Sequence, residues 1–445
     1  MDGELRRADL DRLSASFEAD PKNVLAMNAV TKNEIREVAL NRAAVSGIDH
    51  TYSHMIKTGK ATAQGQTGRC WIFAGLNTLR IHAMKRLNLE DFEFSQTYLM
   101  FWDKLEKANY FLENIIGTMD EPLDGRVVMW LLANIVPDAG QWDMFVNLVE
   151  KYGVVPKKFM PETKSSMATW SMNSLLVEKL REGARDLRVM HEGGASVDEI
   201  RRAKACVLEE FYRMLRIHLG TPPDRFYWEW RDKDDGFHRR GWITPREFYE
   251  EYVGFDLDSV ACLINAPTRD KPYNRMYTVQ YLGNVFGGHP VRYLNVPVEV
   301  MKRAAAEMVK DGIPVWFGAD TGKASYRDLG VFDTEIYDYG TVYGTEFGLD
   351  KAERLDYGQS RMTHAMVFTG VDVDEGGDPR RWRVENSWGE KPGDKGFYTM
   401  TDGWFEEYNY EVMVNKKYLS EELLRALDTE PIVLKPWDPM GALAR

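Results

Sequence analysis

A single cysteine, Cys70, stands in the stretch QGQTGRCWIFAGLN, between a glycine-rich run and the start of an apolar, helix-like pattern. The N-terminus of a helix carries roughly +0.5 elementary charge, which stabilises a thiolate placed there. Gly65 and Gly68 let the backbone approach closely and leave amide N–H groups able to donate. The stretch therefore predicts a cysteine nucleophile at the start of a helix.

A thiolate nucleophile needs a proton partner, most simply a histidine, and a third group that fixes the tautomer of that histidine. An acyl-transfer site also needs an oxyanion hole. Among the eight histidines, His364 differs because THAMVFTGV places it at the start of an apolar strand. Asn386 follows the strand RWRVE, 22 residues later. Two neighbouring strands joined by a loop could bring His364 beside Asn386. Each residue alone is more often structural, but the combination favours catalysis.

The elements that must position these side chains can be predicted from periodicity. Apolar residues at i, i+4, i+7 and i+11 after Cys70 predict one buried helix face, formed by Ile72, Leu76, Leu79 and Ala83. A second helix-like region covers 125–152 and is interrupted by the turn signal PDAGQW. Residues 172–220 predict a helical pair, whose second member opens with a Ser-x-x-Glu capping box.

The pattern changes after about residue 290. Segments such as MVFTGVDV, RWRVENSW and GFYTMTD alternate or run apolar between glycines, which predicts antiparallel strands. Helices first and strands later indicate an α+β fold. The C-terminal LKPWDPMGALAR contains two prolines and cannot make a long helix; by default such a tail is a frayed terminus.

Composition excludes several classes of protein. The 445 residues are 44% hydrophobic, which is enough for a full core, and the net charge of −12 disfavours a general nucleic-acid grip. The acidic, polar N-terminus has no signal-peptide pattern, and no run of 18 apolar residues predicts a membrane span. The absence of HExxH and CxxC patterns argues against a zinc site, so we expect neither a metal nor an organic cofactor.

The cysteine content indicates a reducing compartment. Cys70, Cys206 and Cys262 are odd in number and far apart, so a disulfide framework is not expected. Cys206, in a helical run, and Cys262, in SVACLINAP, are expected to be buried small hydrophobic residues. These features together predict a cytoplasmic protein.

Several motifs give the chain a family resemblance. The frame Thr67-Gly68-Arg69-Cys70-Trp71 resembles the papain signature C-G-[SA]-C-[WY]. With GRCW, MTHAMVFTGVD, VENSWGEKPGDKGFYTMTDGWF and PWDPMGALA, the chain resembles the bleomycin hydrolase and bacterial aminopeptidase C branch of the papain-like cysteine peptidases. The resemblance extends from about residue 20 to the end. The 294 residues from Cys70 to His364 exceed the ~130–150 of papain, as the helical insertion of this branch requires.

This resemblance implies a role for each matching residue. Cys70 would be the nucleophile, His364 the general acid and base, and Asn386 the residue that orients the imidazole. Gln64, with the Cys70 N–H, would form the oxyanion hole. Four further positions would support the site or line the substrate cleft: Trp388 and Trp71 as supporting rings, and Ala139 with Gly140 where the branch often has Gly-Gly.

The resemblance also implies an architecture. It is a papain-like two-lobed fold, in which a helical lobe carries the nucleophile and an antiparallel, barrel-like β lobe carries His and Asn. We expect five segments: 1–60 as an N-terminal extension, 61–155 as the helical lobe, 156–285 as a helical insertion for oligomerisation, 286–428 as the β lobe and 429–445 as an arm in the active-site cleft.

The arm and the assembly have functional implications. The arm would block the non-primed side, and its terminal carboxylate would meet the free amine of the substrate. GALAR suggests that Arg445 is removed, which leaves Ala444 as the terminal ruler. The branch further implies a homohexamer with its active sites facing a central cavity.

The resulting prediction is a cysteine aminopeptidase that acts on peptides through an acyl-enzyme. The branch adds amide-bearing xenobiotics and homocysteine thiolactone as possible substrates. Three alternatives stay open: an endopeptidase whose arm is displaced, a nucleic-acid-binding member of the family, and a catalytically dead scaffold. The complete set of Cys, His, Asn and Gln argues against the last of these.

Overall fold

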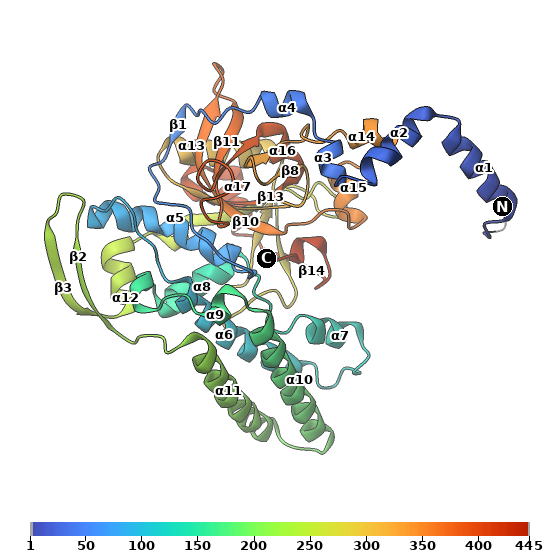
Figure 1. Ribbon diagram of the computed structural model, residues 1–445. Coiled ribbons are helices and arrows are strands. Elements are labelled where there is room, and N and C mark those ends of the chain that lie inside the picture. Colours follow the sequence, from blue (N-terminus) through green and yellow to red (C-terminus); the bar gives the residue numbers. More distant parts are fainter. Residues whose placement is uncertain (1–2, 444–445) are drawn as a thin grey trace.

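The computed structural model describes residues 3–443 and has the mixed α+β architecture expected from the sequence (Figure 1). One lobe is helical and the other is built around a large sheet. No helix in the described part of the chain is both long and apolar enough to cross a membrane.

The helical lobe holds the long buried helix that begins at the cysteine. Its helices are α5 (Cys70–Leu87), α6 (Gln96–Gly117), α7 (Arg126–Ala133) and α8 (Trp142–Tyr152). The Ser95 hydroxyl caps α6 by accepting from the Tyr98 N–H. α8 ends at Gly153, which has φ +70° and packs so closely on Pro245 that a Cβ there would lie 2.3 Å from its backbone.

The β lobe is one twelve-stranded sheet whose central strands carry the site. The order is β14-β5-β6-β4-β13-β7-β10-β11-β12-β9-β8, with β1 pairing with β10. Most pairs are antiparallel, but β14–β5, β4–β6 and β12–β9 are parallel. The strands are β1 (His54–Met55), β4 (Val260–Ile264), β5 (Arg275–Val279), β6 (Tyr293–Asn295), β7 (Val315–Ala319), β8 (Ser325–Tyr326), β9 (Val331–Phe332), β10 (His364–Val373), β11 (Pro379–Glu385), β12 (Phe397–Thr401), β13 (Asn409–Asn415) and β14 (Ile432–Leu434).

Helices on this lobe complete its core. β10 is buried along almost its whole length because it contacts both α5 and α13. This explains why its sequence is apolar on successive residues rather than alternating. The helices of this lobe are α13 (Val298–Lys310), α14 (Tyr339–Tyr343), α15 (Lys351–Asp356), α16 (Asp402–Tyr408) and α17 (Glu421–Leu427).

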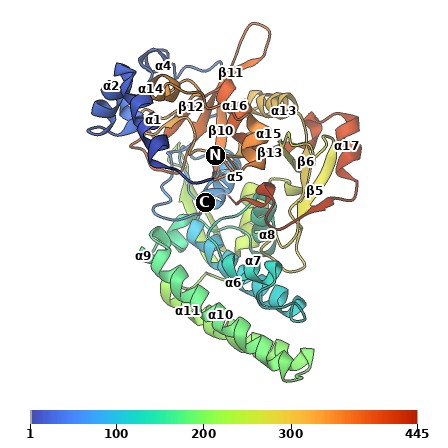
Figure 2. The same cartoon turned by 90° about the vertical axis from the view of Figure 1, so that its right-hand side faces the viewer.

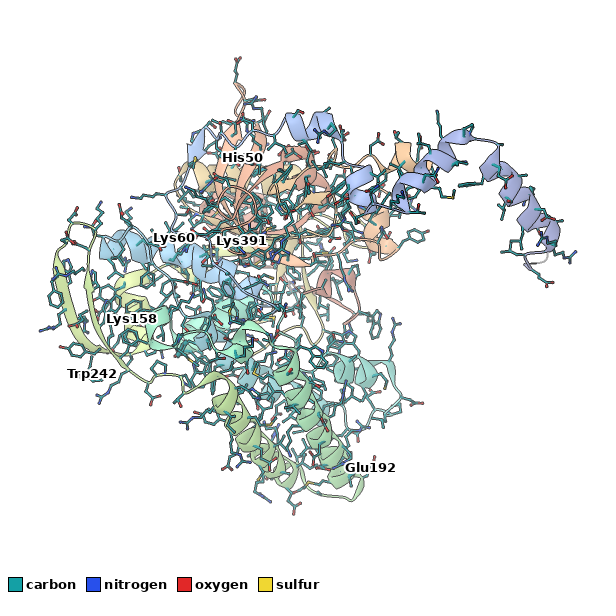
Figure 3. The ribbon with its side chains drawn as sticks, in the orientation of Figure 1. His50, Lys60, Lys158, Glu192, Trp242 and Lys391 are labelled. Atoms are coloured by element: carbon teal, nitrogen blue, oxygen red, sulfur yellow. The ribbon has the colours of Figure 1, made fainter. Side chains whose placement is uncertain are left out.

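The insertion projects from the body as a helical pair and a hairpin (Figures 1 and 2). The capping box predicted for its second helix is present, because Ser196 N donates to Glu199 Oε2 and Glu199 N donates to Ser196 Oγ. In Figure 3 Glu192 marks the outer end of the pair and Trp242 the hairpin. The elements are α9 (Lys164–Met167), α10 (Trp170–Glu192), α11 (Val197–Leu219), β2 (Phe226–Arg231), β3 (Phe237–Ile243) and α12 (Pro245–Phe248).

The N-terminal segment reaches out from the body, with α1 at its far end, whereas α3 and α4 lie against the β lobe (Figure 1). α1 and α2 bury none of their residues, and the apolar residues Leu10, Leu13 and Phe17 are exposed on α1. The elements are α1 (Arg7–Glu18), α2 (Pro21–Val30), α3 (Ile35–Val38) and α4 (Arg42–Ser46).

The C-terminal arm is attached to the body at discrete points. β14 pairs with β5, and the arm then turns through a short 3-10 helix, Pro439–Gly441. The Arg126 guanidinium stacks on the Trp437 ring at 3.6 Å, and Lys271 pairs with Asp438 at 3.0 Å. The described part of this tail is therefore ordered against the body rather than frayed.

Two expectations from the sequence differ from the structure. β4 and β5 lie within 156–285 yet pair into the main sheet, so that segment is not only a helical insertion. Their short, apolar runs could not be assigned to the sheet because their partners β13 and β14 lie far away in the sequence. Cys206 was expected to be buried and is exposed, because only one face of α11 packs against a neighbour. Cys262 is buried as expected.

Candidate active site

Cys70 is the first residue of α5, as the sequence predicts. Its side chain is fully buried, and the Ala365 N–H donates to Sγ at 3.4 Å. Ala365 directly follows His364 at the start of β10, so this contact places the cysteine against the strand that carries the histidine.

Burial opposes ionisation of this thiol. It raises the pKa of Cys70 to about 12, while backbone N–H groups of Ala365, Trp71 and Cys70 itself act in the opposite direction. A helix start alone therefore does not provide the thiolate. A neighbouring group that accepts its proton favours ionisation of a buried thiol, and the adjoining strand carries the His364 imidazole.

His364 begins β10 and Asn386 directly follows the neighbouring strand β11, as their spacing predicts. β10 and β11 pair antiparallel, and His364 Nε2 lies 2.9 Å from Asn386 Oδ1. The Ser387 N–H also donates to Asn386 Oδ1 at 2.8 Å, so the amide oxygen faces the ring and the amide nitrogen does not. Because that oxygen only accepts, Nε2 carries the proton and the tautomer is fixed.

Trp388 covers this pair. Its ring lies 4.8 Å from the His364 ring, centroid to centroid, at 33°. The position agrees with the shielding role implied for it, because an indole over a hydrogen bond displaces water from that bond.

Gln64 lies in the loop that precedes Cys70 and is hydrogen-bonded to the opposite lobe. Its N–H donates to the Ser387 carbonyl at 2.9 Å, and its Oε1 accepts from the Ser387 hydroxyl at 2.5 Å. Nε2 donates one hydrogen to the Thr67 carbonyl at 2.6 Å and has a second hydrogen to offer. The same two segments are joined a second time, because the Gly389 N–H donates to the Thr62 carbonyl. Lys60, labelled in Figure 3, precedes the first segment, and Lys391 follows the second.

Arg69 anchors the nucleophile loop to the insertion. Its fully buried guanidinium forms a fork to Glu162, with N–O distances of 3.0 and 3.3 Å, and donates to the Ser166 carbonyl at 2.7 Å. A planar fork of this kind fixes orientation as well as charge.

Asp138 holds the same loop from the other side. Its carboxylate accepts from the Gly68 N–H at 3.3 Å and pairs with Lys104 at 2.6 Å. Burial pushes the pKa of this carboxyl upwards, but the Lys104 ammonium and hydrogen bonds from Thr169 and Asn173 hold it well below its usual range. The Asp138 carbonyl also accepts from Trp71 Nε1 at 2.7 Å.

Ala139 and Gly140 lie beside Trp71 rather than in open space. Ala139 is buried and its carbonyl accepts from Lys107 Nζ at 2.7 Å. A Cβ on Gly140 would lie 2.4 Å from the Trp71 ring, so only glycine fits there. Gln141 follows and donates from Nε2 to the Ala442 carbonyl of the arm at 2.7 Å. Ala444 lies outside the described residues.

The structure thus brings together Cys70, His364, Asn386, Gln64 and Trp388, all of which were expected at the site. It adds Ser387, Asp138 and the Arg69–Glu162 pair, which sequence reasoning missed. Ser387 stands between two residues singled out in ENSWG, and this position was its only signal. No group of three or more His, Cys, Asp or Glu that could hold a metal ion occurs among residues 3–443.

Comparison with known proteins agrees with this geometry. The profile of the peptidase C1-like family matches residues 4–441. The chain belongs to the peptidase C1-like family. This membership gives the papain-like fold expected from the sequence.

Members of the peptidase C1-like family resemble the chain over its whole length. Aminopeptidase C of Listeria monocytogenes is 47% identical over 444 residues, which is 100% of each chain. Bleomycin hydrolase of Homo sapiens is 47% identical over 441 residues and 97% of each chain. The crystal structure of PepW from Lactobacillus rhamnosis is 47% identical, covers 100% of both chains and superposes with a TM-score of 0.98.

Proposed function

We propose that this protein is a cysteine aminopeptidase of the bleomycin hydrolase type, which releases N-terminal residues from peptides. The observation that carries the proposal is the pairing of His364 with Asn386 directly beside the buried Cys70. The names of the relatives, aminopeptidase C and bleomycin hydrolase, support the same activity.

Cys70 is the nucleophile in this proposal and His364 its acid and base. Because Nε2 is committed to Asn386, proton exchange with the thiol falls to Nδ1 of the same ring. The Cys70 thiol gives its proton to the imidazole, and Sγ attacks the scissile carbonyl. The imidazolium then protonates the leaving amine, and an acyl-enzyme forms. Water resolves the acyl-enzyme with His364 acting as base.

Gln64 and the Cys70 N–H stabilise the negative charge that develops on the carbonyl oxygen. The second Nε2 hydrogen of Gln64 supplies one donor, and the helix N-terminus supplies the other. Ser387 holds Gln64 Oε1 and Asn386 Oδ1 at the same time, so one residue sets the orientation of both side chains.

The C-terminal arm accounts for aminopeptidase rather than endopeptidase activity. Ala442 is fixed to Gln141, and Leu443 lines the same 440 Å³ cavity as Thr363, the neighbour of His364. A chain end near the catalytic strand shortens the non-primed side and sets a carboxylate against the free amine of the substrate. Ala444 is the terminal ruler in this proposal, after removal of Arg445.

Hydrolysis of an aminoacyl-aminomethylcoumarin and of its N-acetylated twin tests the proposal. Cleavage of only the free-amine substrate, lost after iodoacetamide, is expected. A chain that ends at Gly441 should also cut the acetylated substrate. Cleavage of both substrates by the full-length enzyme would identify the alternative, an endopeptidase with a displaceable arm. Activity that is indifferent to iodoacetamide would rule out the Cys70 mechanism.

Removal of Arg445 is tested by intact mass. Active enzyme should lack the C-terminal arginine, while the Cys70→Ala variant should keep it. Active enzyme that retains Arg445 would contradict self-trimming.

A homohexamer is the proposed assembly. Large apolar side chains are exposed on the two segments that project from the body, which supports contact with further copies; they include Leu13 and Leu25 near the N-terminus, and Trp170, Ile217 and Trp242 in the insertion. Light scattering should give about six times the 51.3 kDa chain mass, and elution as a monomer would contradict the proposal.

A cytoplasmic location completes the proposal. The three cysteines are free, which suits a reducing compartment. Nucleic acid is not a proposed partner, because the net charge is −12. Retention on single-stranded DNA at physiological salt would overturn that expectation.

A further inference from the structure

Two buried oxygen atoms lie unpaired beneath the C-terminal arm. Gln141 Oε1 and Glu411 Oε1 have no hydrogen-bond partner within the described chain, although both residues are almost fully buried. Both side chains line one small cavity with Met362, and the arm residues Met440 and Ala442 close it. Buried polar oxygens without a partner are costly and uncommon, so their gathering at one place calls for a physical reason.

Glu411 lies in line with the nucleophile across the sheet. Ala365, which donates to Cys70 Sγ, is opposite Gly318 on β7, and Gly318 is opposite Glu411 on β13. Neighbouring strands are ~4.8 Å apart, which puts the Cα of Glu411 roughly 10 Å from that of Ala365. An extended peptide advances ~3.3 Å per residue, so the side chain of the second residue before the scissile bond reaches this distance.

The strand between Ala365 and Glu411 carries a glycine, Gly318, at the aligned position, and a movable side chain covers it. Gly318 has no side chain, and a Cβ there would lie 2.0 Å from Met362 Sδ. Met362 therefore occupies the space over Gly318, beside Glu411. An unbranched, flexible side chain at that point can move aside when another group enters.

Burial of Glu411, to which the arm contributes from one side, favours the uncharged form of its carboxyl. Burial, with a smaller contribution from the Asp143 carboxyl, raises the pKa of Glu411 to about 8, although a hydrogen bond from the Cys262 thiol acts in the opposite direction. A neutral carboxyl can be covered by Met440 and Ala442 without the penalty of burying an unpaired charge. Removal of the cover rehydrates the carboxyl and returns its pKa toward the usual range, so it ionises at neutral pH.

We propose that the arm covers a second specificity pocket, in which Glu411 and Gln141 receive a cationic side chain, Lys or Arg, of the second residue before the scissile bond. Glu411 supplies the charge, and Gln141 Oε1 supplies an additional acceptor for an ammonium or guanidinium. The pocket is latent in the full-length protein because the arm occupies it. This inference rests on the proposed peptidase function and specifies the substrate class of its uncovered form.

A chain ending at Pro439 uncovers the pocket and keeps the Asp438–Lys271 anchor. Its substrates are N-acetylated dipeptidyl-aminomethylcoumarins with Ala next to the coumarin and Arg, Gln or Leu before it. kcat/KM for the Arg substrate should exceed that for the Leu substrate at least tenfold at pH 8. The preference should decline toward pH 5, as the carboxylate takes up a proton. Glu411→Gln should abolish it, and Glu307→Gln, a change at an exposed glutamate, should leave it unchanged.

The outcomes separate this inference from the proposed function. If the truncated enzyme cuts acetylated substrates without preferring Arg, or keeps the preference after Glu411→Gln, the pocket assignment is overturned and the peptidase function stands. If no variant cuts any substrate and full-length enzyme also cleaves nothing, the proposed function itself fails.

A measurement on the full-length chain covers the case in which the truncated chain does not fold. Met440→Lys brings an ammonium to the cavity wall, next to Glu411. Its effect on the thermal midpoint should be smaller with Glu411 present than in the Glu411→Gln background, because only the carboxylate can pair with the ammonium. Equal losses in both backgrounds would show that the cavity has no preference for a cation and would overturn the proposal.

Discussion

The proposed nucleophile, Cys70, and the proposed base, His364, are held in physically different ways. Around Cys70 the loop is fixed by buried charges, with Arg69 paired to Glu162 and Asp138 paired to Lys104. Around His364 the ring is fixed by neutral groups, the Asn386 amide and the Trp388 indole. Neutral partners leave the imidazole able to gain and lose a proton, whereas buried ion pairs lock a loop that must not move. Loss of a charge should therefore affect folding, and loss of a neutral group should affect catalysis.

The largest effect is expected at the nucleophile itself. Cys70→Ala should reduce kcat/KM for an aminoacyl-coumarin by about 10⁴-fold or more, because no other group can form the acyl-enzyme. The far-UV spectrum and thermal midpoint should change little. Cys206→Ala, at an exposed cysteine, is the matched control and should retain full activity. Substantial activity in Cys70→Ala would place the chemistry elsewhere.

Substitution of the base should alter both rate and thiol chemistry. His364→Gln should lower kcat by about 10²–10⁴-fold, the usual contribution of a general acid and base. Burial raises the pKa of Cys70 to about 12, so without the imidazolium the thiol stays protonated at neutral pH. Alkylation by iodoacetamide at pH 7 should become slow and should increase only at alkaline pH. Fast alkylation at pH 7 in this variant would show that the helix start alone ionises the thiol.

Removal of one buried charge tests whether the ion pairs around the Cys70 loop act on folding. Asp138→Asn leaves the Lys104 ammonium buried without its ion partner and should reduce the free energy of unfolding by about 3–5 kcal/mol. Chemical denaturation measures this directly. Asp311→Asn, which breaks an exposed pair with Lys417, is the control and should be nearly silent. A silent Asp138→Asn would mean that the nucleophile loop does not depend on this ion pair.

The smallest effect is expected at Ser387, which contacts both Gln64 on the Cys70 side and Asn386 on the His364 side. Ser387→Ala removes the hydroxyl donor to Gln64 Oε1 but keeps the backbone N–H donor to Asn386. One lost hydrogen bond of about 1 kcal/mol should lower kcat/KM by roughly fivefold, mainly through kcat. Ser387→Thr keeps the hydroxyl and should restore part of the rate. An unchanged rate in Ser387→Ala would show that Gln64 keeps its orientation without the serine.

Local sequence patterns predicted where the candidate catalytic residues lie in the fold, because each is tied to an element boundary. Cys70 begins a helix, His364 begins a strand and Asn386 follows one, and all three boundaries are where the periodicity predicts them. The ion pairs around the loop were missed because Arg69 and Glu162 are 93 residues apart, and no local pattern links them. Arginine and glutamate are usually exposed, so nothing in the sequence indicated that these side chains are buried.

The same reasoning explains the two differences in the fold. Periodicity indicates that β4 is apolar but not that its partner is β13, almost 150 residues further on. The exposure of Cys206 depends on how many layers cover α11, which is a property of the tertiary packing and not of the helix. Pairing and layering are set by the whole chain, and local propensity contains little information on either.

The contact between Gly140 and Trp71 links the proposed wall of the substrate cleft to the start of the helix that begins at Cys70. A single added carbon at 140 would lie 2.4 Å from the Trp71 ring and would force a shift of that ring, which belongs to the residue after Cys70. Directed evolution of new substrate preferences should therefore find no viable variants at this position and should instead accumulate changes at its neighbour Gln141. Substrate selectivity can therefore change only at positions of the cleft wall that do not pack against the residues around Cys70.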